Sequence, residues 1–193
     1  MNENKFNAAD SLKTIEAAIK ETKIIKTGAA FYYILWGSIL CCYFLIQYLI
    51  QIKTELKGSV IDTFNWVLFP FGGIFSYLNK RKDEKNETYV PQLEKVYFFS
   101  FTGFAIMHAV LTFSSIFLSL PLSIIFFPLI SGLTVYIVGG ISKHKIAIFG
   151  GLFSMLLSII SITSTVEIEC FLASIACITS FIIPGITMRK SNV

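Results

Sequence analysis

The feature that most constrains this chain is an uncharged stretch at residues 96–142, in which 47 consecutive positions carry no Lys, Arg, Asp or Glu. One transmembrane helix needs about 20 apolar residues to cross the roughly 30 Å hydrocarbon core of a bilayer. The stretch is therefore long enough for two crossings. Its turn chemistry is confined to residues 118–121, where Pro121 suits the first turn of a returning helix. The stretch predicts a tight hairpin of two transmembrane helices, at 96–118 and 121–142.

Four more apolar stretches have a similar length, at residues 28–52, 59–78, 146–164 and 167–188. Only 15% of the 193 residues are charged, whereas soluble domains carry about 25%. We therefore expect an all-α integral membrane bundle of six transmembrane helices in one domain, residues 28–188. A cytoplasmic arm (1–27) and a cytoplasmic tail (189–193) flank it.

The arm shows the pattern of a short amphipathic helix. Asn7 or Asp10 can cap it, and Leu12, Ile15 and Ile19 share one face at i, i+3 and i+7. We expect this helix to lie on the membrane surface before the chain turns into the first span. A helix that binds a protein partner is the alternative. The arm contains no apolar segment long enough for a cleavable signal peptide.

Aromatic and small residues suggest how the spans sit and pack. Aromatic side chains near the two ends of the first span are typical of the membrane interfaces, namely Tyr32, Tyr33, Trp36 and Tyr48. In the span at 146–164, small residues recur every third or fourth position, as in a seam for close helix contact: Ala147, Gly150, Ser154, Ser158 and Ser161.

Prolines recur in the even-numbered spans at Pro70, Pro128 and Pro184, which are 58 and 56 residues apart. A threefold repeat of hairpins would produce this spacing. A shared topology, in which every even span ends at the same membrane face, also explains it and is the interpretation we prefer.

The distribution of basic residues predicts the orientation. Connections alternate between the two sides, so the arm, the 79–95 loop, the 143–145 turn and the tail share one side and hold 14 of the 16 Lys and Arg residues. Because cytoplasmic loops carry the excess of Lys and Arg, both termini should be cytoplasmic. Topology also explains the net charge of +4, so we infer no nucleic-acid partner.

Polar residues within the spans are candidate functional groups. Asp62, with Asn65 one turn further, lies inside the second span, and His108, with Thr112 one turn further, lies near the middle of the third. Ionisable residues inside a membrane are costly and often functional. The structural alternatives are an Asp62 at the interface near a helix N-terminus and a His108 hydrogen-bonded to a neighbouring helix. For both residues we prefer the structural alternative to a functional role.

Charged residues at the two membrane faces form two further candidate sites. Glu167 and Glu169 begin the sixth span and, with Asp62, would form an acidic outer rim that concentrates cations. On the cytoplasmic side, a basic patch at Lys80, Arg81, Lys82 and Lys85 would attract anionic headgroups or a protein partner.

Recognisable catalytic motifs are missing from the sequence, including H-E-x-x-H, G-x-S-x-G and the phosphate-binding G-x-x-x-x-G-K. His108 and His144 lie at different depths, so they do not suggest a shared metal. The four cysteines all fall in apolar segments without a C-x-x-C pattern. We expect no enzyme, no cofactor and no metal site.

Short segments in a fixed order resemble a family of small six-span bacterial inner-membrane proteins of unknown function. The resemblance implies a multi-pass location in the bacterial inner membrane and supplies no activity. The chain departs from the family pattern at Lys145-Ile146, where a proline usually follows the basic turn, and at Ile186-Thr187, where leucines usually follow Pro-Gly. The matching segments are Ser11-Leu12-x-x-Ile15-Glu16, Tyr33-x-Leu35-Trp36-Gly37, Lys80-Arg81-Lys82, Gly139-Gly140-Ile141, Gly150-Gly151 and Ile183-Pro184-Gly185.

Two functions remain compatible with these features. The first is a non-enzymatic membrane protein that binds a partner or senses the bilayer through the arm and the basic patch. The second is a small transporter or channel in which Asp62 and His108 handle a proton, a cation or a small solute.

Overall fold

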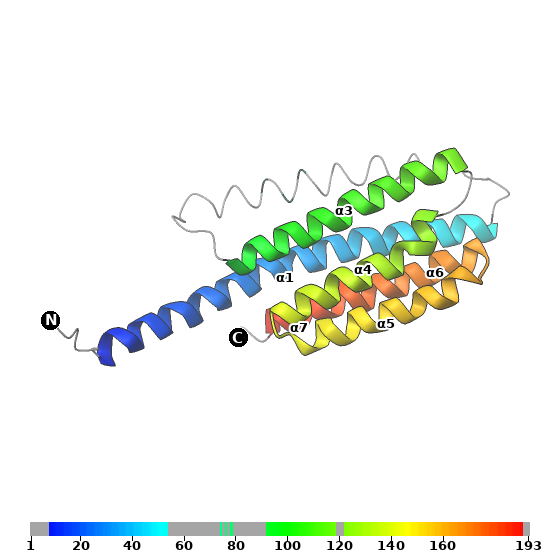
Figure 1. Ribbon diagram of the computed structural model, residues 1–193. Coiled ribbons are helices and arrows are strands. Elements are labelled where there is room, and N and C mark those ends of the chain that lie inside the picture. Colours follow the sequence, from blue (N-terminus) through cyan, green and yellow to red (C-terminus); the bar gives the residue numbers. More distant parts are fainter. Residues whose placement is uncertain are drawn as a thin grey trace.

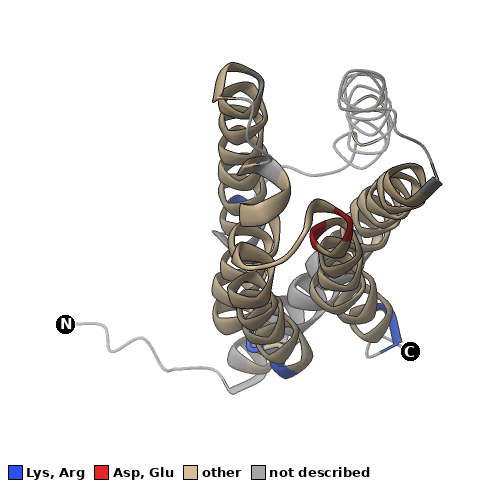
Figure 2. Ribbon diagram, turned by 90° about the vertical axis from the view of Figure 1, so that its right-hand side faces the viewer, with Lys and Arg blue, Asp and Glu red and all other residues tan. Residues whose placement is uncertain are grey.

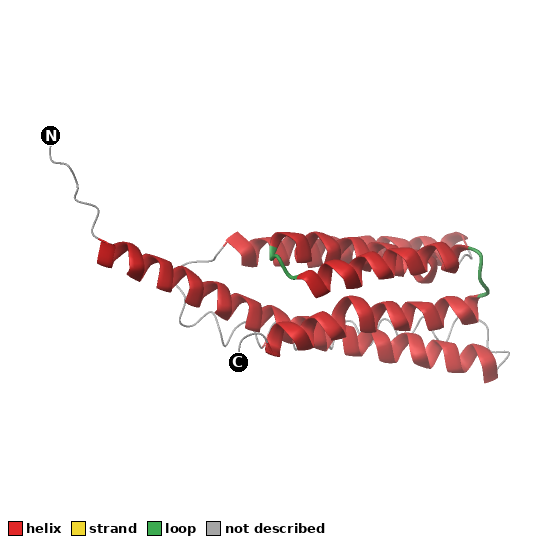
Figure 3. Cartoon of the chain, turned by 90° about the horizontal axis from the view of Figure 1, so that it is seen from below, coloured by secondary structure: helices red, strands yellow, loops and turns green. Residues whose placement is uncertain are grey.

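The computed structural model describes residues 8–53, 74, 76, 78, 92–118 and 122–190. The described part is helical throughout apart from two short connections, and it contains no strand (Figures 1 and 3). The elements are α1 (Ala8–Lys53), α3 (Gln92–Leu118), α4 (Leu122–Ile141), α5 (Lys145–Ile162), α6 (Val166–Cys177), the π-helical turn η2 (Ile178–Ile182) and α7 (Ile183–Lys190).

Five of these helical segments are long and apolar enough to cross a membrane: Ala29–Ile52, Lys95–Ser115, Ile124–Ile141, Lys145–Ile162 and Val166–Lys190. They coincide with five of the six spans expected from the sequence, so the all-α class and these five apolar helices are confirmed. The sixth expected span, at 59–78, lies outside the described residues except for Ile74, Ser76 and Leu78, which are helical.

The arm differs from the expectation of a separate surface helix. Residues 8–53 form one helix of 46 residues, about 69 Å long at 1.5 Å per residue. Its N-terminal part projects beyond the other helices (Figure 1). The physical reason is local, because residues 20–28 hold no proline and only one glycine, Gly28, so nothing in them ends a helix.

Helices α3, α4, α5 and α6 run antiparallel to one another in chain order, and α1 runs antiparallel to α6 (Figure 1). The α4–α5 hairpin forms the most extensive contact, α3 packs on α4, and α1 packs along α6, η2 and α7. The connections described as loops, one after α4 and one after α5, lie at opposite ends of the bundle (Figure 3). This alternation places the start of α6 at one end and the end of α7 at the other.

Small residues allow the close contact between α4 and α5. A Cβ atom added at Gly132 would lie 2.6 Å from the carbonyl oxygen of Gly151, and one added at Gly151 would lie 2.6 Å from that of Gly132. One turn further, the Ser154 hydroxyl donates a hydrogen bond of 2.8 Å to the carbonyl of Pro128. The predicted seam is confirmed for most of its members, since Ala147, Ser154, Ser158 and Ser161 are all buried.

Gly150, the remaining seam residue, faces a different helix. A Cβ atom at this position would overlap the carbonyl oxygen of Thr179 in η2. The π-turn precedes Pro184, which has no N–H to donate within the helix. The Ile183 N–H instead donates to the Ile178 carbonyl, five residues back, as is typical of a π-helical turn. Gly150 of α5 therefore contacts the chain at the π-helical turn η2, where no side chain would fit between the two backbones.

Candidate functional site

His108 lies in the buried core of the bundle, with 4% of its surface exposed. Its imidazole stacks on the ring of Phe104, with centroids 6.1 Å apart and planes at 7°. The ring of Phe127 meets it edge-on, at 5.6 Å and 76°. The Thr112 hydroxyl donates to the backbone carbonyl of His108, at 2.9 Å. The predicted neighbours are thus adjacent, but Thr112 bonds the helix backbone and not the ring.

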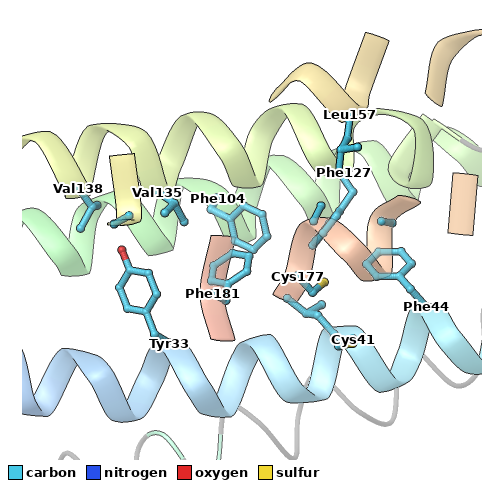
Figure 4. Packing of buried hydrophobic residues seen from close by; sticks show 14 of the residues in the cluster. Tyr33, Cys41, Phe44, Phe104, Phe127, Val135, Val138, Leu157, Cys177 and Phe181 are labelled. Atoms are coloured by element: carbon cyan, nitrogen blue, oxygen red, sulfur yellow. The ribbon is translucent and has the colours of Figure 1, made fainter. Parts of the chain in front are cut away.

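Large rings fill the space around His108. Phe127 lies 4.5 Å from Phe44 and 5.9 Å from Phe104, and Phe104 lies 5.8 Å from Phe181, measured between ring centroids. These residues come from α1, α3, α4 and η2 and interlock where the helices meet (Figure 4). This aromatic core, made of Phe44, Phe104, Phe127, Phe181 and His108, gives the imidazole an apolar packing role in the described structure.

The other predicted intramembrane residues, Asp62 and Asn65, lie outside the described residues, as do Lys80, Arg81, Lys82 and Lys85 of the basic patch. Ser76 is one of three residues between Lys53 and Gln92 that the structure describes. Its hydroxyl accepts a hydrogen bond of 3.1 Å from the indole Nε1 of Trp36, and its backbone carbonyl accepts one of 3.4 Å from the Tyr32 hydroxyl. These bonds place Ser76 beside α1.

Glu167 and Glu169 both lie in the first turn of α6, where the helix dipole favours negative charge. Their surroundings differ. Glu167 is partly exposed, whereas Glu169 is only 3% exposed and its Oε2 atom has no hydrogen-bond partner in the described structure. Burying an ionised carboxylate without a partner is costly. Glu169 is therefore a buried ionisable group, and Glu167 is the more accessible of the two carboxylates.

Buried tyrosines correct one expectation and add a feature that the sequence analysis missed. Tyr33 was expected at the membrane interface, but it is 0% exposed and packs edge-on against Tyr97, with centroids 6.3 Å apart. In Figure 4 its hydroxyl points toward α4, near Val138. The Tyr33 hydroxyl has no hydrogen-bond partner among the described atoms. Aromatic content alone could not distinguish an interfacial tyrosine from one in the core.

A buried amide was also missed. Gln47 is 2% exposed, and its Nε2 donates a hydrogen bond of 2.9 Å to the hydroxyl of Tyr43, one turn earlier on α1. An i, i+4 pair of polar side chains in an apolar helix was the available signal. The bond satisfies one donor of the buried amide within its own helix.

A cationic end faces away from the glutamates. Lys143 and Lys145 flank the turn between α4 and α5, and Arg189 and Lys190 end α7. All four side chains are exposed, and they lie at the end of the bundle opposite Glu167 and Glu169 (Figure 2). The sequence analysis used these cations only to orient the chain.

In the described part of the chain, no group of three or more His, Cys, Asp or Glu side chains could hold a metal ion. Cys41, Cys42, Cys170 and Cys177 are free thiols, and all but Cys42 are buried. Comparisons with family models, with curated proteins and with solved structures give no match to this chain.

Proposed function

We propose that this chain is a non-enzymatic, six-span protein of the bacterial inner membrane that binds a protein partner or senses the bilayer at its cytoplasmic face. The continuous α1 helix is the observation that carries the proposal. It extends 21 residues, from Ala8 to the residue before Ala29, beyond its membrane-length segment. At 1.5 Å per residue this is about 32 Å of helix outside the bundle.

A continuous helix of this kind transmits a movement of its part outside the membrane to its part inside the membrane. No proline interrupts α1 between Ala8 and Lys53, so a partner that tilts the exposed part also tilts the part packed on α6 and α7. Leu12, on the face expected to be apolar, is 59% exposed and is available to such a partner.

A sixth crossing at 59–78 is part of the proposal. Two features support it. α1 ends and α3 begins at opposite ends of the bundle (Figure 1). Ser76 bonds to Trp36, which precedes Lys53 by 17 residues, or about 26 Å of helix. A return crossing between residues 53 and 76 would cover this distance.

The cytoplasmic placement of both termini rests on the charge distribution and is tested by reporter fusions. Fusions at residue 1, after Lys53 and at residue 193 should give cytoplasmic, external and cytoplasmic signals in that order. An external signal from either terminus would contradict the proposed orientation.

Partner binding is tested by crosslinking in intact membranes followed by co-purification. The test compares the full chain with two variants, one lacking residues 2–20 and one carrying Lys80→Glu, Arg81→Glu and Lys82→Glu. We expect each variant to lose a crosslinked species that the full chain captures. Lys53→Glu and Lys57→Glu, on the other predicted face, are the matched charge control. An unchanged set of crosslinks in both variants would count against the proposal.

Transport is the second candidate, and it is favoured by the imidazole of His108 and the carboxyl group of Glu169, which are both buried among the described parts of the spans. Intramembrane groups of this kind often form proton or ion pathways. Flux assays in proteoliposomes should then depend on Asp62→Asn, His108→Ala or Glu169→Gln. If all three variants insert normally and no solute or proton flux changes, the transport function is excluded for these residues.

A further inference from the structure

Two segments that are 43 residues apart in sequence meet at the cationic end of the bundle. His144 caps α5, because its Nδ1 atom accepts a hydrogen bond of 3.2 Å from the backbone N–H of Ala147. On the other side of the ring, its Nε2 atom lies 3.5 Å from the Thr187 hydroxyl of α7. Thr187 in turn donates to the carbonyls of Ile183 and Pro184. The α4–α5 turn and the end of α7 are therefore held side by side.

This contact gathers positive charge from both segments. Lys143 and Lys145 are the sequence neighbours of His144, and Arg189 and Lys190 follow Thr187 by two and three residues. Lys143 adopts a left-handed backbone conformation with φ of 53°, which closes the turn and leaves its side chain exposed. Glu167 and Glu169 lie at the other end of the bundle (Figure 2).

The cations also lie at the depth expected for lipid headgroups. Ile146 directly follows Lys145, Ile186 directly precedes Thr187, and Ile141 lies two residues before Lys143; each isoleucine is between 41% and 51% exposed. Exposed apolar side chains next to exposed cations, at the ends of membrane-length helices, match the boundary between acyl chains and headgroups. The dipole of α5 adds a preference for an anion at this end of the helix.

We propose that Lys143, Lys145, Arg189 and Lys190 form a binding site for the phosphate of an anionic phospholipid headgroup, with the acyl chains lying on Ile141, Ile146 and Ile186. A phospholipid is favoured over a soluble anion because the exposed apolar residues border the cations. The site deepens the bilayer-sensing part of the proposed function and rests on it. It needs neither a protein partner nor a particular orientation.

The test uses the purified full-length protein in a neutral detergent and measures its thermal unfolding midpoint against added lipid. Dioleoylphosphatidylglycerol should raise the midpoint in a saturable manner, whereas dioleoylphosphatidylcholine and inorganic phosphate should not. The variant with Gln at positions 143, 145, 189 and 190 should need at least tenfold more phosphatidylglycerol for the same shift. Lys53→Gln with Lys57→Gln serves as the control that removes basic charge elsewhere and should respond like the natural chain.

Variants that carry only two of the four substitutions keep the proposal testable if the four-residue variant fails to fold. Lys143→Gln with Lys145→Gln, and Arg189→Gln with Lys190→Gln, should each weaken the response by a smaller factor. Lys143→Arg with Lys145→Arg, which keeps both charges, should respond like the natural chain. Equal shifts with phosphatidylcholine, a response to phosphate alone, or an unaltered response in the four-residue variant would overturn the proposal. An unchanged set of crosslinks in the arm and patch variants, together with an intact lipid response, would instead contradict partner binding alone.

Discussion

The α4–α5 interface and the aromatic core hold the same bundle together by opposite means. Between α4 and α5, glycines bring the two backbones so close that an added Cβ would overlap a carbonyl oxygen. In the aromatic core, rings from α1, α3, α4 and η2 fill the space between helices. Lipid tails are as apolar as leucine, so burying apolar surface does little to drive helices together in a bilayer.

This difference teaches where packing specificity resides. At the α4–α5 interface, packing specificity depends on the absence of side chains, since any side chain at Gly132 or Gly151 is too large. In the aromatic core, packing specificity depends on large side chains, since each ring fills a space that lipid could not reach. Substitutions in the two regions should therefore fail in opposite directions, one by overfilling and the other by leaving a cavity.

The largest expected effect is the removal of a ring from the aromatic core. Phe127 is 0% exposed and contacts Phe44, Phe104 and His108. Phe127→Ala should lower the free energy of unfolding by about 3 kcal/mol, mainly through the cavity that it leaves. Phe149→Ala is the matched control, because Phe149 is 69% exposed and its loss should have little effect. Unfolding in mixed detergent micelles measures both, and equal losses would mean that the ring cluster is not a core.

A methyl group at the α4–α5 interface should have the next largest effect. Gly151→Ala places a Cβ 2.6 to 3.0 Å from backbone atoms of Gly132 and Tyr136, which cannot move without shifting a helix. We expect a destabilisation of about 2 kcal/mol from overpacking. Gly140→Ala meets no atom within 4 Å and should be neutral or slightly stabilising. If Gly151→Ala unfolded at the same midpoint as Gly140→Ala, the two helices could not be as close as described.

Loss of the interhelical serine bond should have a smaller effect. Ser154→Ala removes the 2.8 Å bond to the Pro128 carbonyl and should cost about 1 kcal/mol, as interhelical hydrogen bonds in membranes usually do. Ser164→Ala, which removes a bond within its own helix end, is the comparison. A larger loss for Ser164→Ala would indicate that the α4–α5 interface depends on backbone proximity and not on the serine.

The smallest effect should have the opposite sign. Tyr33→Phe removes a hydroxyl that is buried without a partner in the described structure while keeping the ring against Tyr97 and Phe101. We expect the free energy of unfolding to rise by up to about 1 kcal/mol, because an unsatisfied buried hydroxyl is destabilising. Tyr32→Phe, which loses its bond to the Ser76 carbonyl, should not be stabilised. A fall in stability for Tyr33→Phe would show that its hydroxyl is hydrogen-bonded.

Sequence patterns were most informative where one physical requirement dominates. Uncharged length predicted five helices that the structure contains, because a bilayer core of fixed thickness requires long apolar segments. The small-residue pattern predicted the buried face of α5. The patterns were less informative for Tyr33, whose burial depends on which helix lies beside it, and for the arm, where the absence of a helix-breaking residue proved decisive.

By itself, the sequence determined the all-α class, the positions of five apolar helices and the face of α5 that packs against its neighbours, because these follow from local composition and from the 3.6-residue period of a helix. Only the tertiary structure decided that His108 lies among aromatic rings, that Glu169 is buried while Glu167 is not, and that the 143–145 turn meets the end of α7. The physical reason is that a helix pattern specifies which face is apolar, whereas the identity of the neighbour across that face depends on how all the helices fit together.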